Sequence, residues 1–127
     1  MKKIIYILMI SALFISCQSN GVKALSADNM EDYQKLIAGK SLVLVDFNAP
    51  WCGPCKKLSP VIDEIASEKS DAIEIIKINT DVYPQISTAL NIDGIPALIL
   101  YKNGEIIWSH IGLISKEELS DVIAANQ

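Results

Sequence analysis

Arginine is absent from the 127-residue chain, and histidine occurs only once. Eleven lysines stand against fifteen acidic residues, which gives a formal net charge of −4 at pH 7. A nucleic-acid-binding surface needs a cluster of basic side chains to neutralise phosphates. We therefore expect no nucleic-acid partner for this chain.

The chain also lacks an uninterrupted apolar run of about 20 residues, the length that a membrane-spanning helix requires. Its leading apolar stretch, residues 4–15, is broken only by Ser11 and follows Met1-Lys2-Lys3. A basic start followed by about 7–15 apolar residues is typical of a secretory signal. We therefore predict that residues 1–16 are a signal peptide and that the chain is exported.

Cys17 follows the apolar run and a small residue, Ser16. This arrangement resembles the lipobox of bacterial lipoproteins, in which the cysteine is lipidated and becomes the mature N-terminus. The resemblance implies a lipid anchor on the periplasmic side of a bacterial membrane, a tether over residues 17–21 and one domain over residues 22–127. Phe14 stands where the family usually has Leu, and an ordinary cleaved signal with an incidental cysteine is the alternative.

Cysteine is scarce, and two of the three, Cys52 and Cys55, lie three positions apart. If Cys17 carries lipid, an exported chain has no framework of structural disulfides, and its one pair is more suited to reversible redox work. Half of a zinc site is the alternative, but structural zinc takes four ligands and only Cys17 and His110 remain. Haem attachment would need a histidine where the chain has Lys56. We expect neither a metal nor another cofactor.

After residue 21, apolar periodicity predicts alternating strands and helices. The expected strands cover residues 22–25, 41–47, 72–79, 97–101 and 106–111, and the expected helices cover residues 29–38, 52–69, 84–90 and about 115–125. Asn103-Gly104 predicts a hairpin turn, and Ser115 with Glu118 has the form of a capping box. The order β-α-β-α-β-α-β-β-α predicts an α/β fold with three layers, in which helices cover both faces of a central mixed sheet.

The run from 41 to 47 is typical of a strand buried on both faces, and its Asp46 is an anomaly because a lone carboxylate is costly to bury. The next helix begins at the cysteine pair, where unpaired N–H groups and the helix dipole favour a thiolate. One helical turn brings Cys55 back beside Cys52. We therefore predict that Cys52 is an exposed attacking nucleophile, that Cys55 is the resolving thiol, and that Gly53-Pro54 restrict the loop between them.

The segment Trp51-Cys52-Gly53-Pro54-Cys55-Lys56 resembles the active-site motif of thioredoxins, and the chain from about Val22 onward is similar to that family. The agreement extends to Asp46-Phe47, Pro60, Lys77-Ile78-Asn79, Gly94-Ile95-Pro96, Lys102-Asn103-Gly104 and Gly112. The resemblance implies a thioredoxin fold, a monomer and an enzyme that acts on disulfide-containing proteins.

The resemblance also implies roles for individual residues. Asp46 would exchange a proton with Cys55 through water, and Lys77 would tune Asp46. A cis peptide at Ile95-Pro96 would offer the backbone of residue 95 to an extended substrate segment. The same docking surface would include Trp51, Gly53, Pro54 and Gly112. Asn48 departs from the family, which usually has a tryptophan there, and this removes packing and shielding beside the dithiol.

Together these features predict a thiol-disulfide oxidoreductase that reduces protein disulfides outside the cytoplasm. The Gly-Pro between the cysteines resembles the reducing branch, whose potentials lie below those of dedicated oxidants. Such a reductase needs electrons, and analogy with the family implies a membrane thiol transporter as donor. The alternative is a binding or holdase module that uses the fold without redox turnover, against which the cysteine pair, Asp46 and Ile95-Pro96 argue.

Overall fold

The computed structural model describes residues 22–24 and 29–127. Its middle layer is a five-stranded sheet with the strand order β1-β3-β2-β4-β5. The strands are β1 (Val22–Ala24), β2 (Leu42–Asn48), β3 (Glu74–Asn79), β4 (Ala97–Lys102) and β5 (Glu105–Ile111). The first three strands run parallel, whereas β4 is antiparallel to β2 and β5 is antiparallel to β4.

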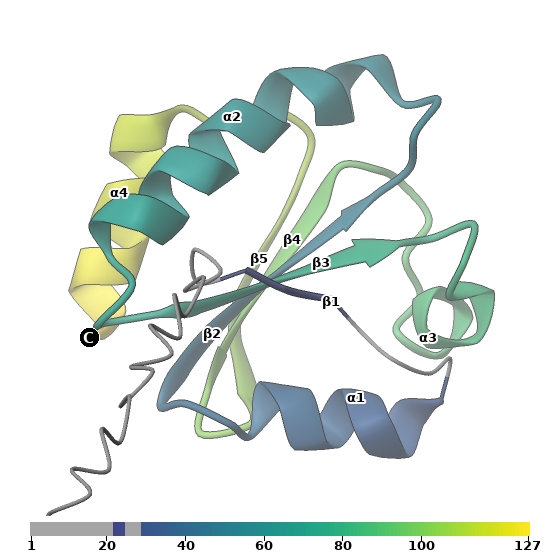
Figure 1. The fold of residues 1–127 in the computed structure, drawn as a ribbon, viewed down its shortest axis with the longest axis horizontal. Coiled ribbons are helices and arrows are strands. Elements are labelled where there is room, and N and C mark those ends of the chain that lie inside the picture. The colour runs from purple at the N-terminus through teal and green to yellow at the C-terminus, as the bar shows by residue number, and fades with distance from the viewer. Residues whose placement is uncertain (1–21, 25–28) are drawn as a thin grey trace, which may run out of the picture.

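Two helices cover each face of the sheet (Figure 1). The helices are α1 (Met30–Ile37), α2 (Gly53–Glu68), α3 (Pro84–Ala89) and α4 (Lys116–Asn126). α2 and α4 lie on one face, and α1 and α3 lie on the other. The predicted element order and the three-layer α/β/α arrangement are therefore confirmed.

The central strand β2 is buried on both sides, as its sequence predicts. Its side chains alternate between the two faces because successive residues of a strand point in opposite directions. Leu42 and Leu44 pack in the core beneath α2 and α4, while Val43, Val45 and Phe47 pack in the core beneath α1 and α3. Asp46 has the parity of the leucines and therefore lies on the α2 side of the sheet.

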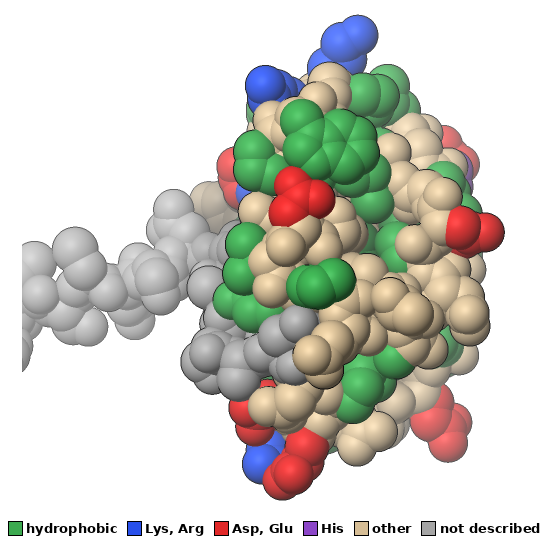
Figure 2. All heavy atoms as spheres, turned by 90° about the vertical axis from the view of Figure 1, so that its right-hand side faces the viewer, with side chains coloured by type: hydrophobic (Ala, Val, Ile, Leu, Met, Phe, Trp, Pro, Cys, Tyr) green, Lys and Arg blue, Asp and Glu red, His purple; other side chains and the backbone are tan. Residues whose placement is uncertain are grey.

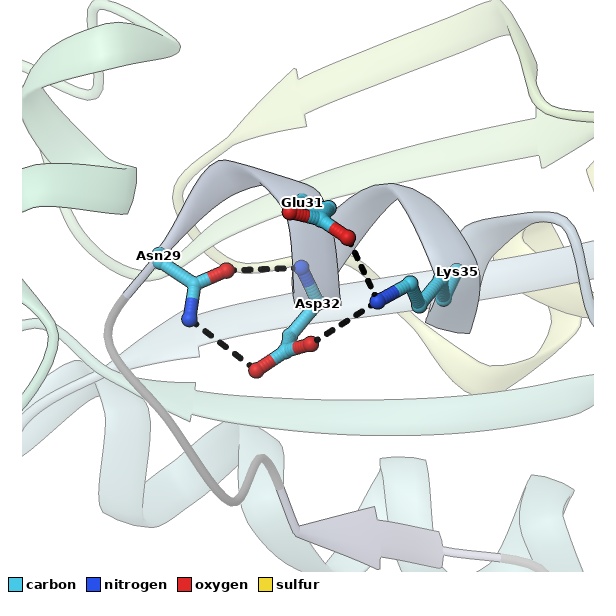
Figure 3. A network of polar contacts seen from close by, with 4 residues as sticks. All are labelled: Asn29, Glu31, Asp32 and Lys35. Atoms are coloured by element: carbon cyan, nitrogen blue, oxygen red, sulfur yellow. Dashed lines mark hydrogen bonds and ion pairs between the residues drawn. The ribbon is translucent and has the colours of Figure 1, made fainter.

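Local sequence signals set the ends of several elements. Asn29 caps α1, because its Oδ1 accepts a hydrogen bond from the Asp32 N–H at 2.8 Å (Figure 3). Lys35 then bonds Glu31 and Asp32 on the same helix face. At the other end of the chain, Ser115 caps α4 by accepting from the Glu118 N–H at 3.1 Å, as the capping pattern predicts.

The Asn103-Gly104 turn joins β4 and β5, and both of its residues have the positive φ that this hairpin requires, 52° and 81°. The third strand is shorter than expected and begins at Glu74. Ala72 and Ile73 instead donate their backbone N–H groups to the Lys69 carbonyl, and so form the turn that follows α2. The strand predicted from the apolar run at residues 72–79 therefore began two residues too early, because a backbone turn occupies its first two residues.

α2 continues through Pro60 without interruption. In the part of the chain that the structure describes, no helix is long and apolar enough to cross a membrane. The expected signal peptide (residues 1–16), the lipidation site Cys17 and the tether (17–21) lie outside the described residues.

Candidate active site

The site forms where β2 ends and α2 begins. Cys52 is the N-cap of α2, with an extended backbone, and its Sγ accepts a hydrogen bond from the Cys55 N–H at 3.2 Å. The Cys52 N–H is itself bonded to the Ala49 carbonyl at 3.1 Å. Pro54 occupies the first turn, where its missing N–H costs nothing. The sulfur of Cys52 therefore lies among the unpaired N–H groups of a helix N-terminus, the setting that favours a thiolate.

Cys52 and Cys55 are joined by a disulfide, with their Cα atoms 5.2 Å apart. Both are buried, at 4% and 6% exposure, because Ala49 and Ile95 pack against them. The expectation that Cys52 is exposed is therefore wrong for this disulfide form. The covering residues come from the loop before the helix and from a distant loop, so a helix-start pattern alone does not reveal them.

Asp46 lies beneath the dithiol on the α2 side of the sheet and is only 3% exposed. Burial raises the pKa of its carboxyl group to about 6, since desolvation disfavours the charged form. The positive charge of Lys77 and a hydrogen bond from Asn48 act in the opposite direction, while the charge of Asp63 raises the pKa further. A carboxyl group with this pKa can take up or release a proton near neutrality.

Asp46 and the resolving cysteine, Cys55, share one cavity of about 200 Å³. It is lined by Asp46, Asn48, Ala49, Pro50, Cys55, Lys56, Ser59 and Lys77. The space is large enough and polar enough to hold water. Asp46, Cys55 and Lys77 therefore share one cavity that can hold water.

Lys77 lies directly opposite Asp46 in the β2–β3 register. Its Nζ, however, donates to Ser59 Oγ at 2.9 Å and to Asp63 Oδ1 at 2.6 Å, both on α2. Lys77 thus acts on Asp46 through its charge rather than through a direct bond. Ser59 and Asp63 were not predicted from the sequence, although their spacing of four residues places them on one helix face and was the available signal.

The Ile95-Pro96 peptide bond is cis, as predicted. Ile95 packs against the two cysteines, and none of the described residues hydrogen-bonds its backbone N–H or C=O. The Pro96 carbonyl accepts a hydrogen bond from the Gly112 N–H at 2.8 Å. Gly112 has a φ of +98°, a conformation that favours glycine. The structure therefore joins the loop at Ile95 to Gly112 beside the dithiol.

Trp51, next to Cys52 in the chain, is 69% exposed, and its Nε1 donates to Asp81 Oδ2 at 2.8 Å. A groove of about 360 Å³ lies beside it, lined by Trp51, Thr80, Ile92, Asp93, Gly94 and Ile95. Figure 2 shows this end of the molecule, where hydrophobic side chains lie open with acidic side chains among them. Gly53 and Pro54 are also exposed here. Asp81 was not predicted, and no local signal marks it, because its contact with Trp51 depends on the path of the loop after β3.

The two sulfurs carry two exchangeable electrons as a dithiol and have given them up when they form the disulfide. The described residues contain no group of three or more His, Cys, Asp and Glu side chains placed to hold a metal ion. The chemistry that the arrangement supports is thiol-disulfide exchange, with a buried carboxyl group in reach of the resolving sulfur.

Comparison with known proteins agrees with this chemistry. The thioredoxin family model matches residues 23–125. An M-type chloroplast thioredoxin from Spinacia oleracea is 44% identical over 106 residues, which cover 83% of this chain and 59% of that protein. Thioredoxin 1 of Synechococcus elongatus is 39% identical over 90 residues, which cover 71% of this chain and 84% of that protein.

Solved structures show the same fold. A mutant thioredoxin from Halobacterium salinarum superposes with a TM-score of 0.74 at 29% identity, covering 85% of this chain and 93% of that one. Oxidised thioredoxin from Plasmodium falciparum superposes with a TM-score of 0.68 at 30% identity, covering 82% and 96% of the two chains. The chain therefore belongs to the thioredoxin family and is a thiol-disulfide oxidoreductase.

Proposed function

We propose that this oxidoreductase works as a reductase of protein disulfides outside the cytoplasm, attached to a membrane through a lipid on Cys17. The observation that carries the redox part is the pairing of Cys52 at the helix N-cap with Cys55 one turn below, above a buried carboxyl group. Members of the family act on disulfide-containing protein substrates.

In the first step the Cys52 thiolate attacks one sulfur of a substrate disulfide. A bond forms between Cys52 Sγ and that sulfur, and the other substrate sulfur leaves as a thiolate. The substrate segment lies extended against the open backbone of Ile95, with Trp51 and Gly112 beside it. Gly53 and Pro54, exposed at the start of the helix, complete the contact surface.

In the second step Asp46 takes the proton of Cys55 through water in the shared cavity. The Cys55 thiolate then attacks Cys52 Sγ, so that the intramolecular disulfide forms and the bond to the substrate breaks. Both substrate sulfurs leave as thiolates and take up protons, so that the substrate becomes a dithiol and has gained two electrons from the cysteine pair. Lys77 favours the ionised state of Asp46 before this step, because its charge lowers the pKa of the carboxyl group.

The reducing direction is supported by Gly53-Pro54 between the cysteines, which resembles the reducing branch of the family. Export and anchoring are supported by the apolar segment 4–15 and by Cys17 directly after it. A reductase in that place needs a supply of electrons, which we assign to a membrane thiol transporter. We expect the enzyme to act as a monomer.

Mixed-disulfide trapping tests the proposal. A full-length Cys55→Ser variant, expressed in a bacterial envelope, should accumulate covalent adducts that a reducing agent releases, because Cys52 still attacks but nothing resolves the product. The matched control is Cys52→Ser with Cys55→Ser, which should form none. Binding of unfolded proteins without any adduct, unchanged by the loss of both cysteines, would instead support the holdase module.

Direction and location need separate measurements. A redox titration of the Cys52–Cys55 pair should give a potential closer to that of thioredoxins than to those of strong periplasmic oxidants, which differ by about 150 mV. Metabolic labelling with a radioactive fatty acid should mark the full chain and not a Cys17→Ser variant. An oxidising potential would overturn the reductase, and labelling that survives loss of Cys17 would overturn the anchor.

A further inference from the structure

Asn48 lies two residues beyond Asp46 on β2, so that the two side chains leave the same face of the strand. Its Nδ2 donates to Asp46 Oδ2 at 3.4 Å and to the main-chain carbonyl of Asp46 at 3.3 Å. Asn48 is half-buried and lines the same cavity as Asp46 and Cys55. The amide is therefore held between two acceptors of one residue, next to the route of the proton.

The two oxygens of the Asp46 carboxyl group have different surroundings. Oδ2 receives the Asn48 amide, whereas Oδ1 is buried and has no hydrogen-bond partner among the described residues. A buried acceptor without a partner is costly, and such atoms are found where a mechanism uses them. The carboxyl group is thus held by the amide at Oδ2, while Oδ1 lies buried without a partner among the described residues.

The other groups that face Asp46 do not bond it. From β3 comes Lys77, which is held by Asp63 and Ser59 of α2, and from α2 come Lys56 and Cys55 on the cavity wall. From β4 the residue in register is the apolar Leu98. Among the described side chains, Asn48 is therefore the only hydrogen-bond donor to this carboxyl group.

We propose that Asn48 is a positioning residue of the resolving step, which holds the Asp46 carboxyl group by Oδ2 in the place from which it accepts the proton of Cys55. The proposal rests on the proposed function, because it acts through the proton transfer assigned there to Asp46. In that transfer the Cys55 S–H bond breaks and an O–H bond forms on Asp46. The Cys55 thiolate then attacks Cys52 Sγ, and the substrate sulfur leaves with the electron pair of the bond that joined it to Cys52.

A donor to a carboxylate favours its ionised form, so loss of the Asn48 amide should raise the pKa of Asp46. Fewer molecules would then carry the base at a given pH, and the resolving step would slow on the acid side. The step can be followed with the full chain carrying Cys17→Ser, so that only two thiols react. The reduced protein is mixed with an excess of an aryl disulfide that releases a coloured thiolate. The first release follows the attack by Cys52. The second release follows resolution by Cys55, and its rate does not depend on the concentration of the reagent.

Asn48→Leu and Asn48→Val both remove the donor, and valine also suits a strand if leucine disturbs folding. The midpoint of the resolving rate against pH should rise in both variants by about one pH unit, or about tenfold in rate on the acid side. The ¹³C signal of the Asp46 carboxyl group, titrated in the disulfide form, should move in the same direction. In an Asp46→Asn background, Asn48→Leu should have no further effect on the resolving rate.

The outcomes separate this inference from the function on which it rests. If Asp46→Asn slows resolution but both Asn48 variants keep the midpoint of the native chain, the positioning role is wrong and the role of Asp46 stands. If the effect of Asn48→Leu persists in the Asp46→Asn background, the amide acts elsewhere and the inference is overturned. If Asp46→Asn leaves the resolving rate unchanged, the proton transfer itself fails, and the inference fails with it.

Discussion

Asp46 binds its proton more tightly in the folded protein than an exposed aspartate does. Burial raises the pKa of the carboxyl group from 3.8 to about 6, so between these values the folded chain holds a proton that the unfolded chain has lost. The resulting stabilisation is present in full below about pH 4 and is lost as the pH rises through about 6. At neutral pH the charge costs about 3 kcal/mol of stability.

Asp46→Asn should therefore increase the free energy of unfolding by about 2–3 kcal/mol at pH 8 and change it little at pH 4, because asparagine is neutral at both. Urea denaturation of the disulfide form at the two pH values measures this. Asp93→Asn is the matched control, since that carboxylate is exposed and should have little effect at either pH. Equal gains at pH 4 and pH 8 would show that packing rather than ionisation sets the effect.

Site residues could be predicted from the sequence where the signal lies within one strand or helix, but not where it depends on a contact between distant segments. Asp46 was recognised because a carboxyl group interrupts an apolar strand, and the cysteine pair because its spacing equals one helical turn. The burial of Cys52 was not predicted, because Ile95 reaches it from more than 40 positions away in the chain. The contact of Asn48 with Asp46 depends on a rotamer that neither residue type fixes by itself.

At the scale of the elements, α4 offers a direct test of a sequence signal. Ser115→Ala removes the acceptor for the Glu118 N–H and should lower the free energy of unfolding by about 1 kcal/mol. Thermal and urea denaturation measure the change, with Ser67→Ala as control, because Ser67 is exposed within α2 and caps nothing. A loss of the same size in both variants would show that the effect comes from replacing any serine by alanine and not from loss of the helix cap.

The order of helices and strands could be predicted because the helices repeat apolar residues about every four positions, whereas the inner strands are short, continuous apolar runs bounded by turn residues. Element ends were less accurate where backbone bonds decide them, as at Lys69, whose carbonyl ends α2 and delays β3. The strand order β1-β3-β2-β4-β5 was not predicted, since it depends on contacts between elements that are far apart in the chain. The placement of the site at the junction of β2 and α2 needed only the local signals.

At the scale of the whole molecule, the redox site and the proposed anchor lie in separate parts of the chain. The family match begins at residue 23, whereas Cys17 and the apolar segment precede it. The residues that line the site cavity all come from positions 46–77. Membrane attachment and disulfide chemistry should therefore respond independently to substitution, because distant sites without shared partners usually act additively.

Cys17→Ser in the full-length chain should consequently release the protein from the membrane fraction while leaving its rate of disulfide reduction, with a soluble dithiol as electron source, within a factor of about two. Attachment falls because acyl chains supply the apolar surface that holds such a protein in a bilayer. Detergent phase partition and a protein-disulfide reduction assay on the same preparations measure the two properties. Cys52→Ser is the reciprocal control and should stay attached while losing reduction. A Cys17→Ser protein that stays in the detergent phase would place the anchor in the uncleaved apolar segment. A Cys17→Ser protein that loses reduction would show that residues 17–21 belong to the working enzyme.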